Sequence, residues 1–109
     1  MRLTLSLVLL IAFIAASCSK DPEACIEVDK NSVTVGESIQ LTSCSKRALS
    51  FIWSFSGPEG ATANSIQRSE ESFSFSFDTA GSYTVKLQAF YRYSWLGAWD
   101  TTNTVITVN

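Results

Sequence analysis

The chain has 109 residues, of which 46% are hydrophobic, and it carries 8 Lys and Arg against 10 Asp and Glu, with no His. That length fits one domain with a modest core, and the formal net charge of −2 argues against nucleic acid as a partner, because phosphate contacts need clustered Lys and Arg. Without His, the three Cys cannot build an ordinary closed zinc site or a His-activated nucleophile, so we expect no enzyme activity, no cofactor and no bound metal.

Residues 1–17 have the layout of a secretory signal peptide. Arg2 gives a short basic start, residues 3–14 are apolar apart from Thr4 and Ser6, and small residues follow. The apolar stretch is shorter than the roughly 20 residues that a membrane-spanning helix needs. An uncleaved membrane anchor is the alternative interpretation of this segment.

The end of this segment carries a motif for lipid attachment. Ala15-Ala16-Ser17-Cys18 resembles the lipobox of bacterial lipoproteins, in which diacylglycerol is attached to the cysteine sulfur and the new amino terminus is then acylated. Ala15 departs from the more usual leucine. The resemblance implies lipidation of Cys18, and two or more acyl chains hold a protein stably in a membrane.

Residues 18–23 are polar and short, and we expect them to be a tether between the lipid and the folded domain. Ser19 directly after the cysteine resembles outer-membrane sorting, and the cluster from Lys20 to Glu23 is similar to signals that send some lipoproteins to the cell surface. A plain solvated linker is the alternative. The expected location is the bacterial outer membrane, with the protein lipid-anchored and, if the cluster is an export signal, exposed at the cell surface.

The number of cysteines is also consistent with an exported protein in an oxidising compartment. With Cys18 lipidated, Cys25 and Cys44 remain as an even pair in an exported chain, which predicts a structural disulfide. Closing a loop of about 20 residues contributes on the order of 3 kcal/mol in the chain-entropy model.

From residue 24 onward the chain consists of short alternating segments separated by turn signals, with no helical period, which predicts an all-β domain. Phe51, Trp53 and Phe55 alternate with other residues, and a central Trp is the usual core anchor of a β-sandwich. Residues 61–71 predict a loop with one weak strand near 65–67. The other strands are expected at 25–29, 33–35, 38–44, 73–77, 83–89 and 101–108, with Ile106 and Val108 inward.

The stretch from Ser72 to Phe90 contains two of these strands, joined by the turn residues 78–81. Its spacing D-T-A-G-S-Y looks like the corner of an immunoglobulin-like sandwich, where the hydroxyl of a tyrosine, here Tyr83, bonds back to upstream backbone. We therefore expect an immunoglobulin-like sandwich of about seven strands over residues 24–109.

Three segments together resemble a PKD domain: V-G-E-S-I-Q-L-T at 35–42, F-I-W-S-F-S-G at 51–57 and F-D-T-A-G-S-Y-T-V-K-L at 77–87. The last matches the family's F-x-x-x-G-x-Y-x-V-x-L strand. The family's W-D-F-G-D-G turn is degenerate, because Ser54, Ser56, Pro58 and Glu59 replace its acidic and glycine residues, so calcium binding tied to that turn is not implied. The resemblance implies an extracellular interaction or spacer module.

Carboxylates offer no catalytic pair. Glu59, Glu70, Glu71, Asp78 and Asp100 are scattered over turns, whereas carboxylate catalysis needs two acids held across a cleft. We expect the Glu70-Glu71 pair to be a solvated loop and Asp78 to cap a turn.

The hairpin from Tyr91 to Trp99 is too aromatic for an ordinary solvated connection. Exposed aromatic clusters mark contact sites, and Trp, Tyr and Arg are the usual interface hot spots. We therefore predict that it binds a glycan or protein ligand, while Tyr91 continues the inward parity of the preceding strand into the core. The alternatives are that these rings complete the core, and that the protein is a structural or spacer subunit of an envelope-associated complex. The predicted ligand-binding residues are Arg92, Tyr93, Trp95 and Trp99.

Overall fold

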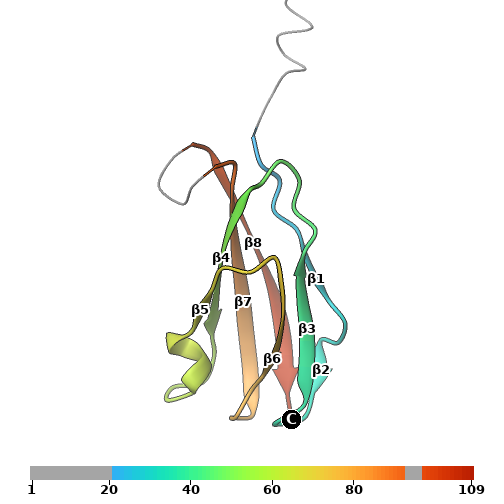
Figure 1. The fold of residues 1–109 in the computed structure, drawn as a ribbon. Coiled ribbons are helices and arrows are strands. Elements are labelled where there is room, and N and C mark those ends of the chain that lie inside the picture. Colours follow the sequence, from blue (N-terminus) through green and yellow to red (C-terminus); the bar gives the residue numbers. More distant parts are fainter. Residues whose placement is uncertain (1–20, 93–96) are drawn as a thin grey trace, which may run out of the picture.

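The computed structural model describes residues 21–92 and 97–109 and places in them eight strands and one short 3-10 helix (Figure 1). The expected signal peptide and Cys18 lie outside the described residues. The described residues contain no helix long and apolar enough to cross a membrane. The elements in chain order are β1 (Ile26–Val28), β2 (Ser32–Val33), β3 (Ser38–Ser43), β4 (Ser50–Ser56), η1 (Thr62–Ser65), β5 (Gln67–Arg68), β6 (Ser72–Ser76), β7 (Gly81–Phe90) and β8 (Trp99–Val108).

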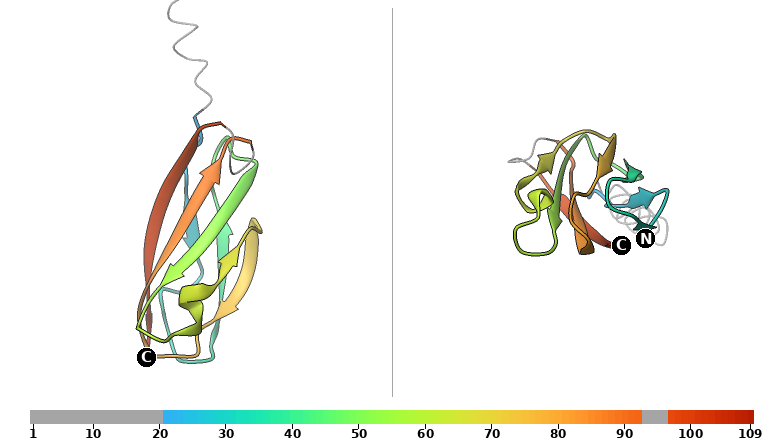
Figure 2. Two further views of the ribbon diagram at one scale, coloured as in Figure 1. Left: turned by 90° about the vertical axis from the view of Figure 1, so that its left-hand side faces the viewer. Right: turned by 90° about the horizontal axis from the view of Figure 1, so that it is seen from below.

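These strands form two sheets, ordered β1-β3-β6 and β2-β8-β7-β4-β5, which face each other as the two layers of a sandwich (Figure 2). Neighbouring strands are antiparallel, except for β2, which pairs in parallel with the end of β8. β1 and β2 follow each other in the chain but belong to opposite sheets. β1 is an edge strand of the three-stranded sheet, and β2 is an edge strand of the five-stranded sheet. The all-β immunoglobulin-like architecture predicted from the sequence is confirmed, with eight strands in place of about seven.

Alternating apolar residues of both sheets form the core. Trp53 in β4 is fully buried, and its Nε1 donates a hydrogen bond to the Glu70 carbonyl oxygen at 2.7 Å, as a buried indole N–H requires. Phe55 stacks on Phe75 of the opposite sheet with ring centroids 4.5 Å apart, which joins the two layers. The other large side chains with no appreciable exposure are Ile39, Leu41, Phe77, Tyr83, Val85, Leu87 and Ile106.

The chain crosses from one sheet to the other between β6 and β7, at the corner that the sequence predicted. Tyr83 Oη donates to the Thr79 carbonyl oxygen at 2.6 Å. Asp78 accepts hydrogen bonds from Thr62 Oγ1 at 2.8 Å and from Thr79 Oγ1 at 3.2 Å. The carboxylate therefore ties the corner to η1, which is a wider role than the turn cap expected for it.

The predicted disulfide is present and joins Cys25 to Cys44. Both residues lie one position beyond the register pair Ile26↔Ser43 of the antiparallel strands β1 and β3, their Cα atoms are 4.8 Å apart, and Cys44 N donates to the Cys25 carbonyl oxygen at 3.0 Å. The bond therefore closes the first strand of the domain onto its neighbour, directly after the residues that lead in from the tether.

Several element boundaries differ from the sequence prediction; β7, for example, begins at Gly81, two residues before the expected start at Tyr83. The weak strand expected near 65–67 is the end of η1 followed by β5 at Gln67–Arg68, because hydrogen bonds from Asn64 N to the Ala61 carbonyl oxygen and from Ile66 N to the Ala63 carbonyl oxygen turn the backbone before it extends. The last strand begins at Trp99, two residues earlier than expected, because Trp99 pairs with Phe90 at the end of β7.

Candidate interaction surface at the hairpin end

The hairpin between β7 and β8 lies at the end of the sandwich where the described chain begins (Figure 1). Its base is closed by the register pair Phe90↔Trp99 and by a hydrogen bond from Tyr91 N to the Ala98 carbonyl oxygen at 2.9 Å. Gly97 has φ +83, a left-handed conformation that Gly adopts at no steric cost. Of the four predicted ligand-binding residues, Tyr93 and Trp95 lie outside the described residues, whereas Arg92 and Trp99 can be placed.

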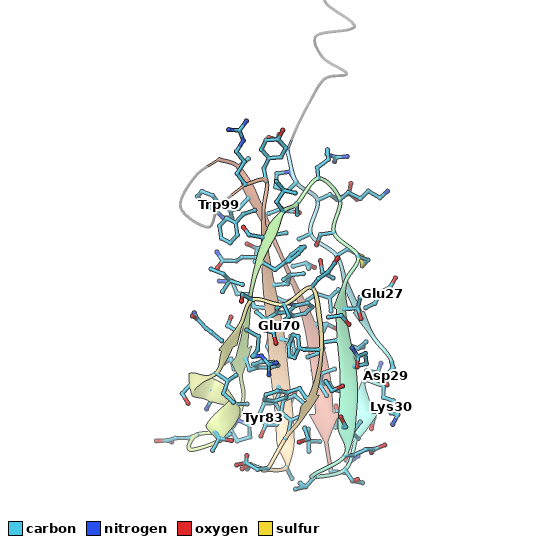
Figure 3. The ribbon with its side chains drawn as sticks, in the orientation of Figure 1. Glu27, Asp29, Lys30, Glu70, Tyr83 and Trp99 are labelled. Carbon is cyan, nitrogen blue, oxygen red and sulfur yellow. A yellow bond between two sulfur atoms is a disulfide. The ribbon has the colours of Figure 1, made fainter. Side chains whose placement is uncertain are left out.

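Trp99 is 61% exposed although it begins a strand, and Figure 3 shows its side chain at this end of the molecule. Its ring lies 6.4 Å from that of Phe90, centroid to centroid, and Phe90 is only 4% exposed. The exposed ring is therefore carried by a paired strand and backed by a buried aromatic side chain. A large apolar group held in this way loses little conformational entropy when something binds to it.

At the end of β7 the buried aromatic residue is Phe90 and not Tyr91, which the sequence predicted to be buried. Parity predicted Tyr91 in the core, but Tyr91 is only half-buried and lies just past the end of β7. Phe90, of the opposite parity, is the buried ring, and Trp99 lies beside it on the outer side of the sheet. The two-residue period fails here because the strand ends.

Arg92 is exposed, and main-chain contacts fix its position. Its carbonyl oxygen accepts a hydrogen bond from Ser50 Oγ at 2.6 Å, which ties the hairpin to the start of β4. Its guanidinium carbon lies 5.5 Å from the centre of the Tyr91 ring, within the range of a cation–π contact. Among the described residues the guanidinium forms no ion pair, so it can meet an anionic or hydroxyl-bearing partner.

Two other segments, residues 21–24 and 45–50, meet the hairpin at this end. Ala24 N donates to Asp100 Oδ2 at 2.8 Å, and Arg47 Nε donates to the Asp21 carbonyl oxygen at 2.7 Å. Glu23 pairs with Lys46 in an isolated antiparallel bridge. We call this assembly, residues 21–24, 45–50, 90–92 and 97–100, the hairpin end.

Sequence reasoning missed the contribution of the β3–β4 connection to this surface. Leu49 is 78% exposed, and its N–H donates to the Phe90 carbonyl oxygen at 2.8 Å, so it lies beside the base of the hairpin. Lys46 and Arg47 precede it and are the only two consecutive basic residues in the sequence. That doublet beside an apolar residue is a signal that could have identified the segment.

Two carboxylates away from this end, Glu70 and Asp78, are engaged with neighbouring polar groups. Arg68 donates to both oxygens of Glu70, with Nε at 3.2 Å and 3.1 Å, and this hydrogen bonding lowers the pKa of Glu70 to about 2. The hydroxyl of Thr62 lowers the pKa of Asp78. Glu70 is thus part of an exposed ion pair as well as of the loop predicted for it.

One shallow hollow of about 180 Å³ is lined by Glu27, Val28, Asp29, Gln40 and Thr42 on β1 and β3. It is smaller than the roughly 300 Å³ from which small-molecule sites usually start. Within the described part of the chain, no three His, Cys, Asp or Glu side chains gather as metal ligands would. The hairpin end is thus the strongest candidate for a contact surface.

The two facing sheets, the Tyr83 corner and the central Trp53 define a small immunoglobulin-like β-sandwich domain of the kind that works by contact or as a spacer. The family model of the PKD domain matches residues 24–105. The chain belongs to the PKD domain family, an immunoglobulin-like family that is non-catalytic and typically extracellular or surface-exposed. A comparison with curated proteins found no match.

Proposed function

We propose that this protein is a membrane-anchored extracytoplasmic lipoprotein whose PKD domain acts as an interaction module. A lipid on Cys18 holds it in the bacterial outer membrane, and the hairpin end is its contact surface. The observation that carries the proposal is Trp99, a 61% exposed ring mounted on a paired strand beside the exposed Arg92. Flat aromatic faces beside a guanidinium suit the two ligand classes predicted from the sequence, a glycan or an envelope protein.

The anchor is tested with Cys18→Ala. We expect the substituted protein either to leave the membrane fraction or to stall before cleavage, while Ser19→Ala, next to it, keeps normal processing. Mass spectrometry of the amino-terminal peptide should find the lipid on Cys18. A substituted protein that is cleaved normally and still sediments with membranes would disprove the lipid anchor.

The contact surface is tested with Trp99→Ala and, as a matched control, Thr101→Ala, the next outward-facing and exposed position of β8. Binding to a glycan array and to envelope proteins should fall at least tenfold for Trp99→Ala, which corresponds to about 1.4 kcal/mol, and remain unchanged for Thr101→Ala. Equal binding by both variants would remove Trp99 from the contact surface.

The second candidate function is a structural or spacer subunit of an envelope-associated complex. The family itself favours it, because PKD domains serve as spacers as well as interaction modules. Under this function, the complex should assemble normally with Trp99→Ala, and lengthening the tether after Cys18 should disturb it instead.

A further inference from the structure

The hairpin end is also the end that a lipid on Cys18 would hold against the membrane. Three peptide units separate Cys18 from Asp21, which is at most about 11 Å of extended chain. Asp21 is fixed to the hairpin end through the hydrogen bond from Arg47 Nε to its carbonyl oxygen, and Pro22 next to it is buried. The headgroup layer of one leaflet is about 5–8 Å thick, so little space separates this end from the bilayer.

We propose that the hairpin end rests in the headgroup layer of the membrane that anchors the chain, with Trp99 and Leu49 as its apolar contacts and Lys46 and Arg92 facing anionic headgroups. This inference rests on the proposed lipid anchor and names the first partner of the contact surface.

The exposed side chains are of the types that favour a membrane interface. Trp is enriched at the level of the headgroups, where an amphipathic ring is partly apolar and partly wet. Leu49 and Trp99 are the two most exposed large hydrophobic residues among those described, at 78% and 61%. They lie on either side of the end of β7, since Leu49 N bonds to the Phe90 carbonyl oxygen and Trp99 pairs with Phe90 on the other side.

Charge is distributed unevenly along the domain. An anionic membrane would therefore orient the domain with its hairpin end toward the lipid surface. The hairpin end holds three basic and three acidic residues, whereas the remaining described residues hold three basic and seven acidic ones. Lys and Arg near an anionic lipid surface are attracted to it, and Asp and Glu are repelled. The body of the domain is therefore pushed away from the membrane more strongly than the hairpin end.

Two of the three acids at the hairpin end are occupied by contacts of their own. Glu23 lies 3.6 Å from Arg47, and Asp100 is half-buried and accepts the hydrogen bond from Ala24 N. Lys46 and Arg92 form no ion pair among the described residues. Both side chains are exposed, so they can meet anionic headgroups.

In the lipidated protein, the headgroups of the anchoring leaflet are the first partner within reach of the hairpin end. A glycan or protein docked on the hairpin end would have to share with the tether a gap of at most about 11 Å between Cys18 and Asp21. Lipid headgroups already occupy that gap, so they do not have to diffuse into it as a soluble ligand would.

The test measures where Trp99 lies in the processed, lipidated protein, reconstituted in vesicles of phosphatidylethanolamine and phosphatidylglycerol with brominated acyl chains. Trp95→Phe leaves Trp99 as the exposed reporter, because Trp53 is fully buried in the core. We expect brominated lipid to quench the Trp99 emission and aqueous acrylamide to quench it weakly.

A matched reporter at the far end of the domain is Val35→Trp in the Trp95→Phe, Trp99→Phe background. Val35 is 47% exposed, and its N–H bonds to the carbonyl oxygen of Asn109, the last residue of the chain. Acrylamide should quench this reporter and brominated lipid should not. If brominated lipid quenches both reporters equally, the domain lies flat, and the end-on contact is disproved.

The charge contribution is tested with Lys46→Gln and Arg92→Gln, compared with Lys86→Gln in the middle of β7. The readout is the ratio of domains with Trp99 in contact with the membrane to domains with Trp99 in water, taken from the quenching of Trp99. Lys46→Gln and Arg92→Gln should each lower this ratio about fivefold, and Lys86→Gln should leave it unchanged. Unchanged ratios for all three would overturn the part assigned to Lys46 and Arg92.

Absence of lipid on Cys18 would overturn the anchor together with this contact, whereas a lipidated protein with Trp99 open to acrylamide would overturn the contact alone.

Discussion

A substitution at Gly57 tests how closely the corner of the sandwich is packed. A Cβ atom at this position would lie 2.2 Å from Cδ2 and 2.4 Å from Cε2 of Tyr83, far inside the contact distance of about 3.5 Å between carbon atoms. The Tyr83 ring cannot move aside easily, because its hydroxyl is bonded to Thr79 and its face packs on Phe77 with ring centroids 4.3 Å apart.

The backbone at Gly57 is held as firmly as the ring. Gly57 N donates to Asn64 Oδ1 at 2.7 Å, and Asn64 Nδ2 donates to the Pro58 carbonyl oxygen at 2.8 Å. Gly57→Ala therefore overpacks a site that cannot relax, which costs about 1–3 kcal/mol. For a domain of this size, that loss lowers the unfolding midpoint by roughly 4–24 °C.

Thermal unfolding followed by circular dichroism measures the effect, with Ser56→Ala, the exposed neighbour on β4, as the control that should stay within about 0.5 kcal/mol of the parent. In a Tyr83→Leu background the extra cost of Gly57→Ala should largely vanish, since the ring it strikes is gone. A midpoint for Gly57→Ala within about 2 °C of the parent, or an undiminished cost in the Tyr83→Leu background, would refute the reasoning.

Three further outcomes follow from the described contacts. Replacing Cys25 and Cys44 together by Ala should lower the free energy of unfolding by about 3 kcal/mol, measured by denaturant titration; an unchanged transition midpoint would contradict this. The pKa of Glu70 lies at about 2, below its ordinary value of 4.5, so its ion pair stabilises the fold above about pH 4.5 and is lost as the pH falls toward about 2; carbon NMR titration should show this pKa rising toward the ordinary value in Arg68→Ala, and an unmoved pKa would refute the assignment. Trp99→Ala should shift the unfolding midpoint by only a few degrees, within about 1 kcal/mol, because the ring is 61% exposed; a larger loss would mean that the ring belongs to the core.

Much of the fold is determined by local patterns in the sequence. Residues that alternate every second position face one side of a strand, so the inward positions of Trp53, Val85 and Ile106 could be predicted without any knowledge of the partner strands. The pairing of Cys25 with Cys44 followed from counting the cysteines and from placing them on neighbouring strands. The corner at Tyr83 was predicted because the spacing D-T-A-G-S-Y resembles the corner of an immunoglobulin-like sandwich.

The ends of the strands could not be predicted in this way. Tyr91 was expected in the core because the alternation was continued past the point where β7 stops, and the buried ring is Phe90. The end of a strand depends on how far its neighbour continues, and here that neighbour is β8, which begins at Trp99. The register of two strands is a property of the pair and not of either segment.

The composition of the candidate surface was decided only by the tertiary structure. The sequence by itself determined that an aromatic hairpin joins the last two strands and that the segment 18–23 before the domain is polar and short. It contained no indication that Asp21, Leu49 and Trp99 would meet at one end, because these residues are far apart in the chain and their proximity depends on which strands cross between the sheets. The same holds for Gly57, whose close approach to Tyr83 arises because β4 and β7 are paired, a non-local contact that no two-residue period can encode.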